Sequence, residues 1–196
     1  MNREAHFKDT REHLLDTGEA VMSLRGFSAV GLAEILTEAG VPKGSFYHYF
    51  KSKEAYGADM LKRYFERYDA DLKALLERPA GTGRSRLTEY FRRWATRHEG
   101  KSCQQGCFAV KMSGEVSDLS EPMRLALADG MVRITRRLAD GVRAGQADGS
   151  LAVSLDPVSC AEALYSMWIG ADLMAKTQRS ALPLQSALRQ TEVWLA

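Results

Sequence analysis

The feature that most constrains the fold is a long series of apolar residues spaced three and four apart. Between residues 53 and 78 this spacing gives one apolar stripe along a helix. Its members are Leu61, Tyr64, Phe65, Tyr68, Leu72, Leu75 and Leu76. Similar spacing recurs along the chain, and no alternation of apolar and polar residues persists that would indicate strands. The sequence therefore predicts an all-α fold of about nine helices.

Residues that favour helix ends divide the chain further. Gly26 and Gly40 suit the position after a helix, Asp9 or Thr10 suits the first N-cap, and Ser52 suits a later one. Residues 79–83 form the clearest break. These signals predict helices over residues 10–25, 32–39, 42–49, 53–78, 86–98, 121–145, 157–179 and 183–195, and a short helix that begins at residue 107.

Composition excludes several classes of protein. The 196 residues are 45% hydrophobic and 27% charged, as in ordinary soluble domains. No apolar run approaches the roughly 18 residues of a membrane span, and the polar N-terminus does not resemble a signal peptide, so we expect a cytoplasmic protein without membrane contact. Three cysteines are too few for a disulfide framework. The net charge of +2 means that nucleic-acid binding would have to depend on a local patch.

Residues 31–50 predict such a patch, because two short helices joined at Gly40 have the layout of a helix-turn-helix. The second helix would enter the major groove with its N-terminal residues toward the bases. Its polar residues, and those that begin the next helix, are the candidate DNA contacts: Lys43, Gly44, Ser45, Tyr47, His48, Lys51, Ser52 and Lys53. Short helix pairs also occur in many other helical proteins, so the layout alone leaves DNA binding open.

The exact residues of this segment are more specific than its layout. The string GFSAVGLAEILTEAGVPKGSFYHYFKSKEAY strongly resembles the N-terminal DNA-binding domain of TetR-family transcriptional repressors. The match covers about residues 8–60. It departs from the family pattern at Gly31, where Thr is usual, and at Leu36, where Ala is usual.

The resemblance implies a DNA-binding domain over residues 1–51 and an effector-sensing and dimerisation domain over residues 52–196. It implies phosphate contacts for Tyr47 and Lys53, and base contacts for Lys43, Ser45 and His48. It also implies a homodimer, formed through the helices at 157–179 and 183–195, on a pseudo-palindromic double-stranded operator. Apolar residues such as Tyr165, Trp168 and Trp194 on these helices support a dimer surface.

The second domain carries aromatic and methionine residues with two interpretations. Trp94, Phe108, Met112 and Trp168 are ordinary core residues or the lining of a pocket for a lipophilic effector. The sequence indicates no cofactor.

The stretch SCQQGCFAVK holds Cys103 and Cys107, and four interpretations compete for the cysteines. A metal site would use His98 with both thiols, but this spacing matches no recognised zinc pattern. A structural disulfide between them is disfavoured in the cytosol, and simple packing suits Cys160. A reactive thiol suits Cys107, because the dipole at a helix start lowers a thiol pKa and Lys111 follows one turn later.

A closer resemblance favours the reactive thiol. The run from Gly106 to Arg124 is similar to the electrophile- and oxidant-responsive TetR subgroup that contains the N-ethylmaleimide reductase repressor. It implies that Cys107 is the sensing thiol, with Lys111 or Lys176 as its partner and Cys103 as an alternative or resolving thiol. Two alternatives stay open: a repressor induced by a reversible lipophilic ligand, and a thiol-based redox enzyme, which the absence of a CxxC motif disfavours.

Overall fold

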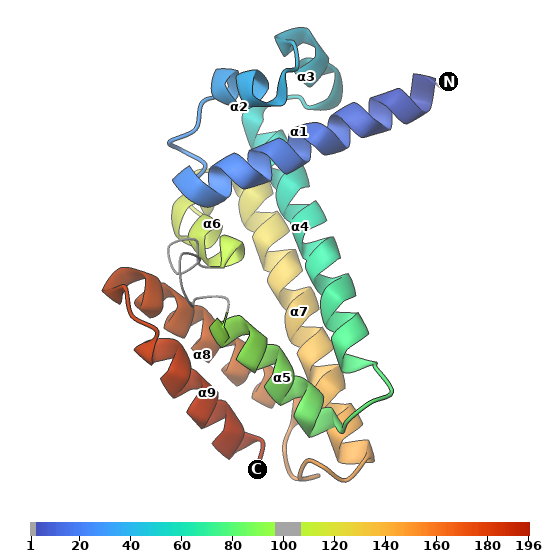
Figure 1. Cartoon of the computed structure of the whole chain (residues 1–196), viewed down its shortest axis with the longest axis vertical. Helices are drawn as coiled ribbons and strands as arrows, with labels where there is room; N and C mark the ends of the chain where they lie inside the picture. Colours follow the sequence, from blue (N-terminus) through green and yellow to red (C-terminus); the bar gives the residue numbers. More distant parts are fainter. Residues whose placement is uncertain (1–2, 97–106) are drawn as a thin grey trace. The chain divides into compact units, whose positions relative to one another are not determined.

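The computed structural model describes residues 3–96 and 107–196, and the side chains of its first helix from residue 9 onward. These residues form nine α-helices and no strand, which confirms the predicted all-α class (Figure 1). The helices are α1 (Arg3–Arg25), α2 (Leu32–Ala39), α3 (Lys43–Tyr49), α4 (Lys53–Leu76), α5 (Gly83–Thr96), α6 (Phe108–Val116), α7 (Glu121–Ala147), α8 (Pro157–Gln178) and α9 (Leu182–Trp194). Among the described residues, no helix is long and apolar enough to cross a bilayer.

The chain divides into two compact units. The first unit holds residues 1–64 and 111–128, and the second unit holds residues 65–110 and 129–196. Both α4 and α7 contribute turns to each unit. The functional boundary expected at residues 51 and 52 stays a prediction.

Local capping explains several helix ends. Gly40 ends α2 in the left-handed conformation (φ 64°), and its amide donates back to Leu36 and Thr37. The Ser52 hydroxyl accepts from the Ala55 amide at 3.1 Å and starts α4 as predicted. Asp156 caps α8 by accepting from the Ser159 amide at 2.8 Å.

Two helices start several residues earlier than predicted. α1 begins at Arg3, before the expected caps at Asp9 and Thr10. α5 begins at Gly83 instead of Arg86, because its first amides find acceptors far away in the chain. Asp148 accepts from the Gly83 amide at 2.6 Å, and the Ser150 hydroxyl accepts from the Arg84 amide at 3.1 Å.

The second unit has an aromatic core centred on Trp168. This indole is fully buried, stacks on Phe91 with 5.1 Å between ring centroids, and donates to the Thr191 hydroxyl at 2.9 Å. Tyr165 on the same helix is 7% exposed. These two residues therefore fill the core of their own chain and do not form the expected dimer surface, whereas other apolar residues of α8 and α9 are exposed.

Candidate nucleic-acid interface and thiol site

The helix-turn-helix of the first unit is held by a small apolar core. Ile35, Leu36 and Phe46 are buried. Phe46 contacts the rings of Phe50 and Tyr56, with centroid distances of 5.1 and 5.3 Å. Because its core side is fixed by these aromatic contacts, α3 has one defined outer face.

That outer face carries most of the predicted DNA contacts. Lys43, Gly44, Tyr47 and His48 are exposed, and Ser45 is half-buried. The Lys43 ammonium lies 5.9 Å from the centroid of the Tyr47 ring, a cation–π distance. Ammonium, hydroxyl and imidazole groups on one short helix match the groups that contact phosphates and base edges in a major groove.

The start of α4 holds the remaining three predicted contacts in different settings. Lys51 is exposed, and Ser52 is used as the N-cap. Lys53 turns inward: its ammonium donates to the Phe27 carbonyl at 2.6 Å and lies 4.2 Å from the centroid of the Phe27 ring. Burial lowers the pKa of Lys53, although Glu54 and Glu115 oppose this shift. The bond to Phe27 uses one of the three N–H donors of the Lys53 ammonium.

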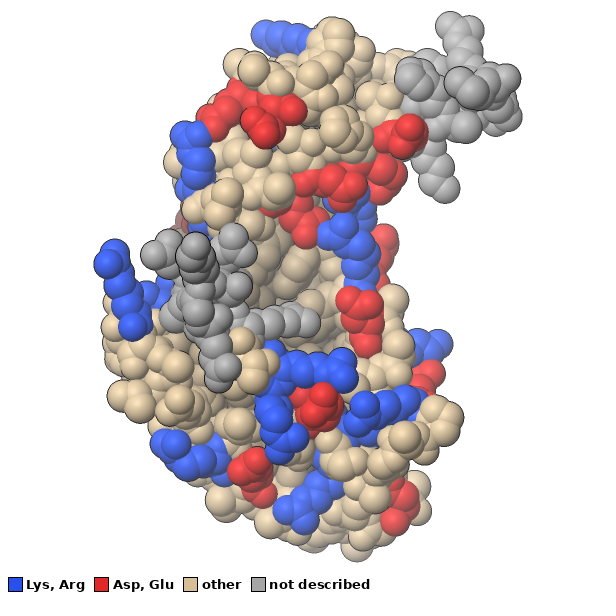
Figure 2. Space-filling model, in the orientation of Figure 1, with Lys and Arg blue, Asp and Glu red and all other residues tan. Residues whose placement is uncertain are grey.

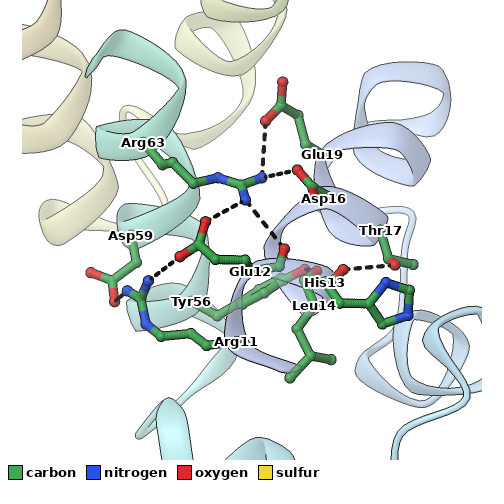
Figure 3. Close-up of polar contacts among 10 residues, drawn as sticks. All are labelled: Arg11, Glu12, His13, Leu14, Asp16, Thr17, Glu19, Tyr56, Asp59 and Arg63. Atoms are coloured by element: carbon green, nitrogen blue, oxygen red, sulfur yellow. Dashed lines mark hydrogen bonds and ion pairs between the residues drawn. The ribbon is translucent and has the colours of Figure 1, made fainter. Parts of the chain in front are cut away.

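A charged network, missed in the sequence, joins α1 to α4 (Figure 3). Arg63 is 12% exposed and pairs with three acids of α1: Glu12 at 2.9 Å, Asp16 at 2.7 Å and Glu19 at 3.5 Å. Nearby, Arg11 pairs with Asp59 at 2.8 Å. Figure 2 shows acidic and basic side chains intermingled over α1 and α4. The spacing of the α1 acids, three and four apart, was the available signal.

The first unit also includes most of α6. Glu115 accepts from the backbone amides of Phe27 at 3.0 Å and Ser28 at 2.5 Å, in the turn after α1. Burial favours the neutral acid, but the hydrogen bonds from Ser28 and Phe27 and the charge of Lys111 hold the pKa of Glu115 below its ordinary 4.5. The Lys111 ammonium donates to the Ser23 carbonyl at 2.8 Å. Both side chains thus connect α6 to the end of α1.

In the second unit, Cys107 lies directly before α6 and is half-buried. The sequence predicted that this helix begins one residue earlier, at Cys107, which would place the cysteine in the first helical turn. Its backbone amide donates to Asp172 Oδ2 at 3.0 Å. The other oxygen of this carboxylate, Oδ1, accepts from Trp94 Nε1 at 3.0 Å. Asp172 is fully buried, and sequence reasoning missed it although it is an isolated acid within an apolar helix.

Tyrosines lie around the Trp94 ring that donates to this carboxylate. The Trp94 ring contacts Tyr90 and Tyr165, both with 6.0 Å between centroids. The hydroxyls of Tyr68 and Tyr90 are 2.6 Å apart. Burial raises the pKa of Tyr90 and of Tyr165 well above 10, and the nearby Cys107 adds to both shifts.

The other predicted effector residues occupy separate positions. Lys176 lies on α8 one turn after Asp172 and is half-buried. Trp94, Phe108, Met112 and Trp168 are all buried. Cys103 and His98, which the sequence offered as thiol and metal ligand, lie outside the described residues, and the described part of the chain holds no group of three His, Cys, Asp or Glu side chains suited to a metal.

Comparison with known proteins decides the family. Residues 14–55 match the model for bacterial regulatory proteins of the tetR family, and residues 83–191 match the tetracyclin repressor-like C-terminal domain. The chain belongs to the TetR family. This confirms the resemblance found in residues 8–60.

Relatives of this TetR-family chain extend over nearly its whole length. It is 43% identical to the HTH-type transcriptional repressor NemR of Escherichia coli, over 96% of this chain and 94% of that protein. It is 33% identical to the HTH-type transcriptional repressor DhaR of a Mycobacterium species, over 91% and 88%. The crystal structure of the reduced form of E. coli NemR superposes with a TM-score of 0.89, covering 94% of this chain and 96% of that one at 44% identity.

Proposed function

We propose that this chain is a homodimeric DNA-binding repressor that leaves its operator when Cys107 is modified by an electrophile or oxidant. The DNA-binding part is supported by the outer face of α3, where Lys43, Tyr47 and His48 are exposed above a fixed aromatic core. The functional domains would be residues 1–51 for DNA and 52–196 for sensing and dimerisation. The named relatives are transcriptional repressors, which supports a regulatory and non-enzymatic role.

One observation supports a link between Cys107 and DNA binding. α6 begins directly after Cys107, and the same helix is hydrogen-bonded to the end of α1. Lys111 and Glu115 of α6 bond to Ser23, Phe27 and Ser28. A group added to the Cys107 sulfur would therefore act on the helix that contacts the start of the helix-turn-helix segment. The NemR structure is described as a reduced form, which supports a thiol whose oxidation state matters.

Dimerisation is supported by apolar side chains on the last two helices. Val158, Leu173 and Met174 of α8 and Leu182, Val193 and Trp194 of α9 are between 40% and 67% exposed. Exposed apolar groups at this density are typical of an interface. A symmetric dimer would place two α3 helices about one DNA turn or more apart on a pseudo-palindrome.

The experiment measures binding to a labelled duplex from upstream of the chain's own gene, with and without an electrophile such as N-ethylmaleimide. We expect salt-dependent binding by the wild type, and release after treatment. Cys107→Ser should bind the duplex with unchanged affinity and stay bound after treatment. Cys160→Ser is the matched control, because burial raises the pKa of the Cys160 thiol and makes it the less reactive site.

Normal release of Cys107→Ser would exclude Cys107 as the sensor. A reversible lipophilic effector would then be favoured. Turnover of a peroxide or disulfide substrate without DNA binding would instead identify a thiol enzyme.

The predicted base and phosphate contacts are tested with the same duplex. Lys51→Ala should weaken binding at every sequence and reduce the salt slope by about 1, as expected for one lost phosphate contact. Lys43→Ala should weaken binding and relax the preference at individual base pairs. Unchanged affinity in both variants would show that this face does not contact DNA.

A further inference from the structure

Asp172 is a buried carboxylate within an otherwise apolar stretch of α8. Its neighbours in sequence are Ala171, Leu173 and Met174, and its own exposed fraction is zero. Placing a carboxylate in such surroundings is costly unless both oxygens accept hydrogen bonds. Both do: one accepts from the indole of Trp94 and one from the amide of Cys107.

The indole alone does not require a charged partner. In the same unit, the buried indole of Trp168 donates to the neutral hydroxyl of Thr191 at 2.9 Å, the same kind of bond as that of Trp94. A hydroxyl or amide at position 172 would satisfy Trp94 in the same way.

The charge lies close to the Cys107 sulfur. The carboxylate oxygen is 3.0 Å from the Cys107 amide nitrogen. Because the sulfur is three bonds from that nitrogen, it lies within roughly 4 Å of it, and hence within roughly 7 Å of the carboxylate. At this range a negative charge disfavours a second one.

We propose that Asp172 is a positioning residue that holds Cys107 at the start of α6 and, through its charge, restrains the thiol from forming its reactive thiolate. The inference rests on the proposed sensing role of Cys107. Asp172 thereby opposes the helix dipole, which favours the thiolate at the same position. The balance between the charge of Asp172 and the dipole of α6 sets how strong an electrophile must be before Cys107 reacts.

Other charged or titratable groups near Cys107 could also change its reactivity with pH, so they are identified before the test. Tyr90 and Tyr165 have a pKa raised well above 10 and stay protonated between pH 6 and 10. Lys111 and Lys176 are cations on α6 and α8, and the Lys111 ammonium already donates to a carbonyl. All four are kept unchanged in the variants below.

The test compares Trp94→Phe with the double variant Trp94→Phe/Asp172→Asn. Phe removes the indole donor from both proteins, so the Asn amide group meets no opposing N–H there. The Asn oxygen can still accept from the Cys107 amide, so the two variants differ in the charge at position 172 and in the NH2 group that replaces one carboxylate oxygen. The rate of Cys107 alkylation by iodoacetamide is measured from pH 6 to 10 by site-resolved mass spectrometry, without DNA.

We expect the two pH profiles to cross. For each unit by which the thiol pKa falls, the thiolate fraction at low pH rises about tenfold, while thiolate nucleophilicity falls roughly threefold. The double variant should therefore react about threefold faster at pH 6–7 and about threefold slower on the high-pH plateau. Altered packing alone would scale the rate by one factor at all pH values.

Parallel profiles, or a slower double variant at pH 6–7, would overturn the proposal. Thr191→Val, which removes the acceptor of Trp168, is the control for general loosening of this core and should not shift the profile. If the double variant does not fold, as judged by its circular dichroism, the single variant Asp172→Asn is compared with wild type under the same criterion. Crossed profiles together with normal release of Cys107→Ser would keep this inference and reject the proposed sensing function.

Discussion

The tightest fit of a single residue in the first unit is at Gly18, where α1 meets Tyr56 of α4. A Cβ atom at Gly18 would lie 1.7 Å from the Tyr56 hydroxyl oxygen. That hydroxyl is buried and donates to the Leu14 carbonyl at 2.5 Å. The glycine therefore makes room for a hydrogen bond that fixes α1 against α4.

Gly18→Ala should consequently destabilise the protein by about 1–3 kcal/mol, because Tyr56 must move and leave the Leu14 carbonyl. Urea denaturation followed by circular dichroism measures this. Gly114→Ala in α6 is the matched control: a Cβ there meets nothing within 4 Å, and helix propensity predicts a gain of about 0.5–1 kcal/mol. Equal effects of the two substitutions would contradict the role given to Gly18.

In α6, two charged side chains bond to backbone groups of a distant segment. Glu115 accepts from two amides in the turn after α1, and Lys111 donates to a carbonyl at the end of α1. Neither contact is between neighbours in sequence. A short helix is thus fixed by its charged residues as well as by buried ones such as Met112 and Val116.

Glu115→Gln should lower the free energy of unfolding at pH 7 by about 1 kcal/mol, since a neutral amide accepts more weakly than a carboxylate. The folded-state pKa of Glu115 is depressed. Its contribution is therefore complete above the unfolded value near 4.5 and is lost as the pH falls through the lower folded value.

The difference between wild type and Glu115→Gln should accordingly shrink below pH 4.5. Urea titrations at pH 7, 5 and 4 measure it, with Glu121→Gln, which removes an exposed pair with Arg124, as the control. A difference that stays constant over this range would show that the Glu115 charge does not stabilise the fold.

At the scale of the whole molecule, the exposed apolar side chains of α8 and α9 are the surface of the proposed dimer. Leu173 is 54% exposed on α8. Leu173→Glu should shift the protein to monomers and weaken operator binding at least about tenfold, because one copy holds one half-site. Analytical ultracentrifugation and duplex binding measure the two effects.

Val153→Glu is the matched control for this substitution, since Val153 is 85% exposed but lies in the segment before α8. It should leave both the dimer and the operator affinity unchanged. A dimeric Leu173→Glu variant with normal affinity would remove this face of α8 from the interface.

The sequence by itself determined the helical class, the family and most helix positions. These depend on local signals: apolar spacing of three and four, Gly40 in a left-handed turn, and Ser52 and Asp156 as caps. The start of α5 at Gly83 was predicted wrongly because the side chains that accept from its first amides belong to residues 148 and 150. Capping by residues so distant in the chain cannot be recognised from the residues next to the helix start.

Only the tertiary structure decided which groups meet around the functional residues. The apolar character of Trp168 allows a core or a dimer surface, and the residue lies in the core. Asp172 lies 65 positions from Cys107 and 78 positions from Trp94 in the chain, yet its carboxylate accepts hydrogen bonds from both. Periodicity identifies the buried face of a helix, but which helices pack against that face, and which polar groups are paired when water is excluded, depends on long-range packing.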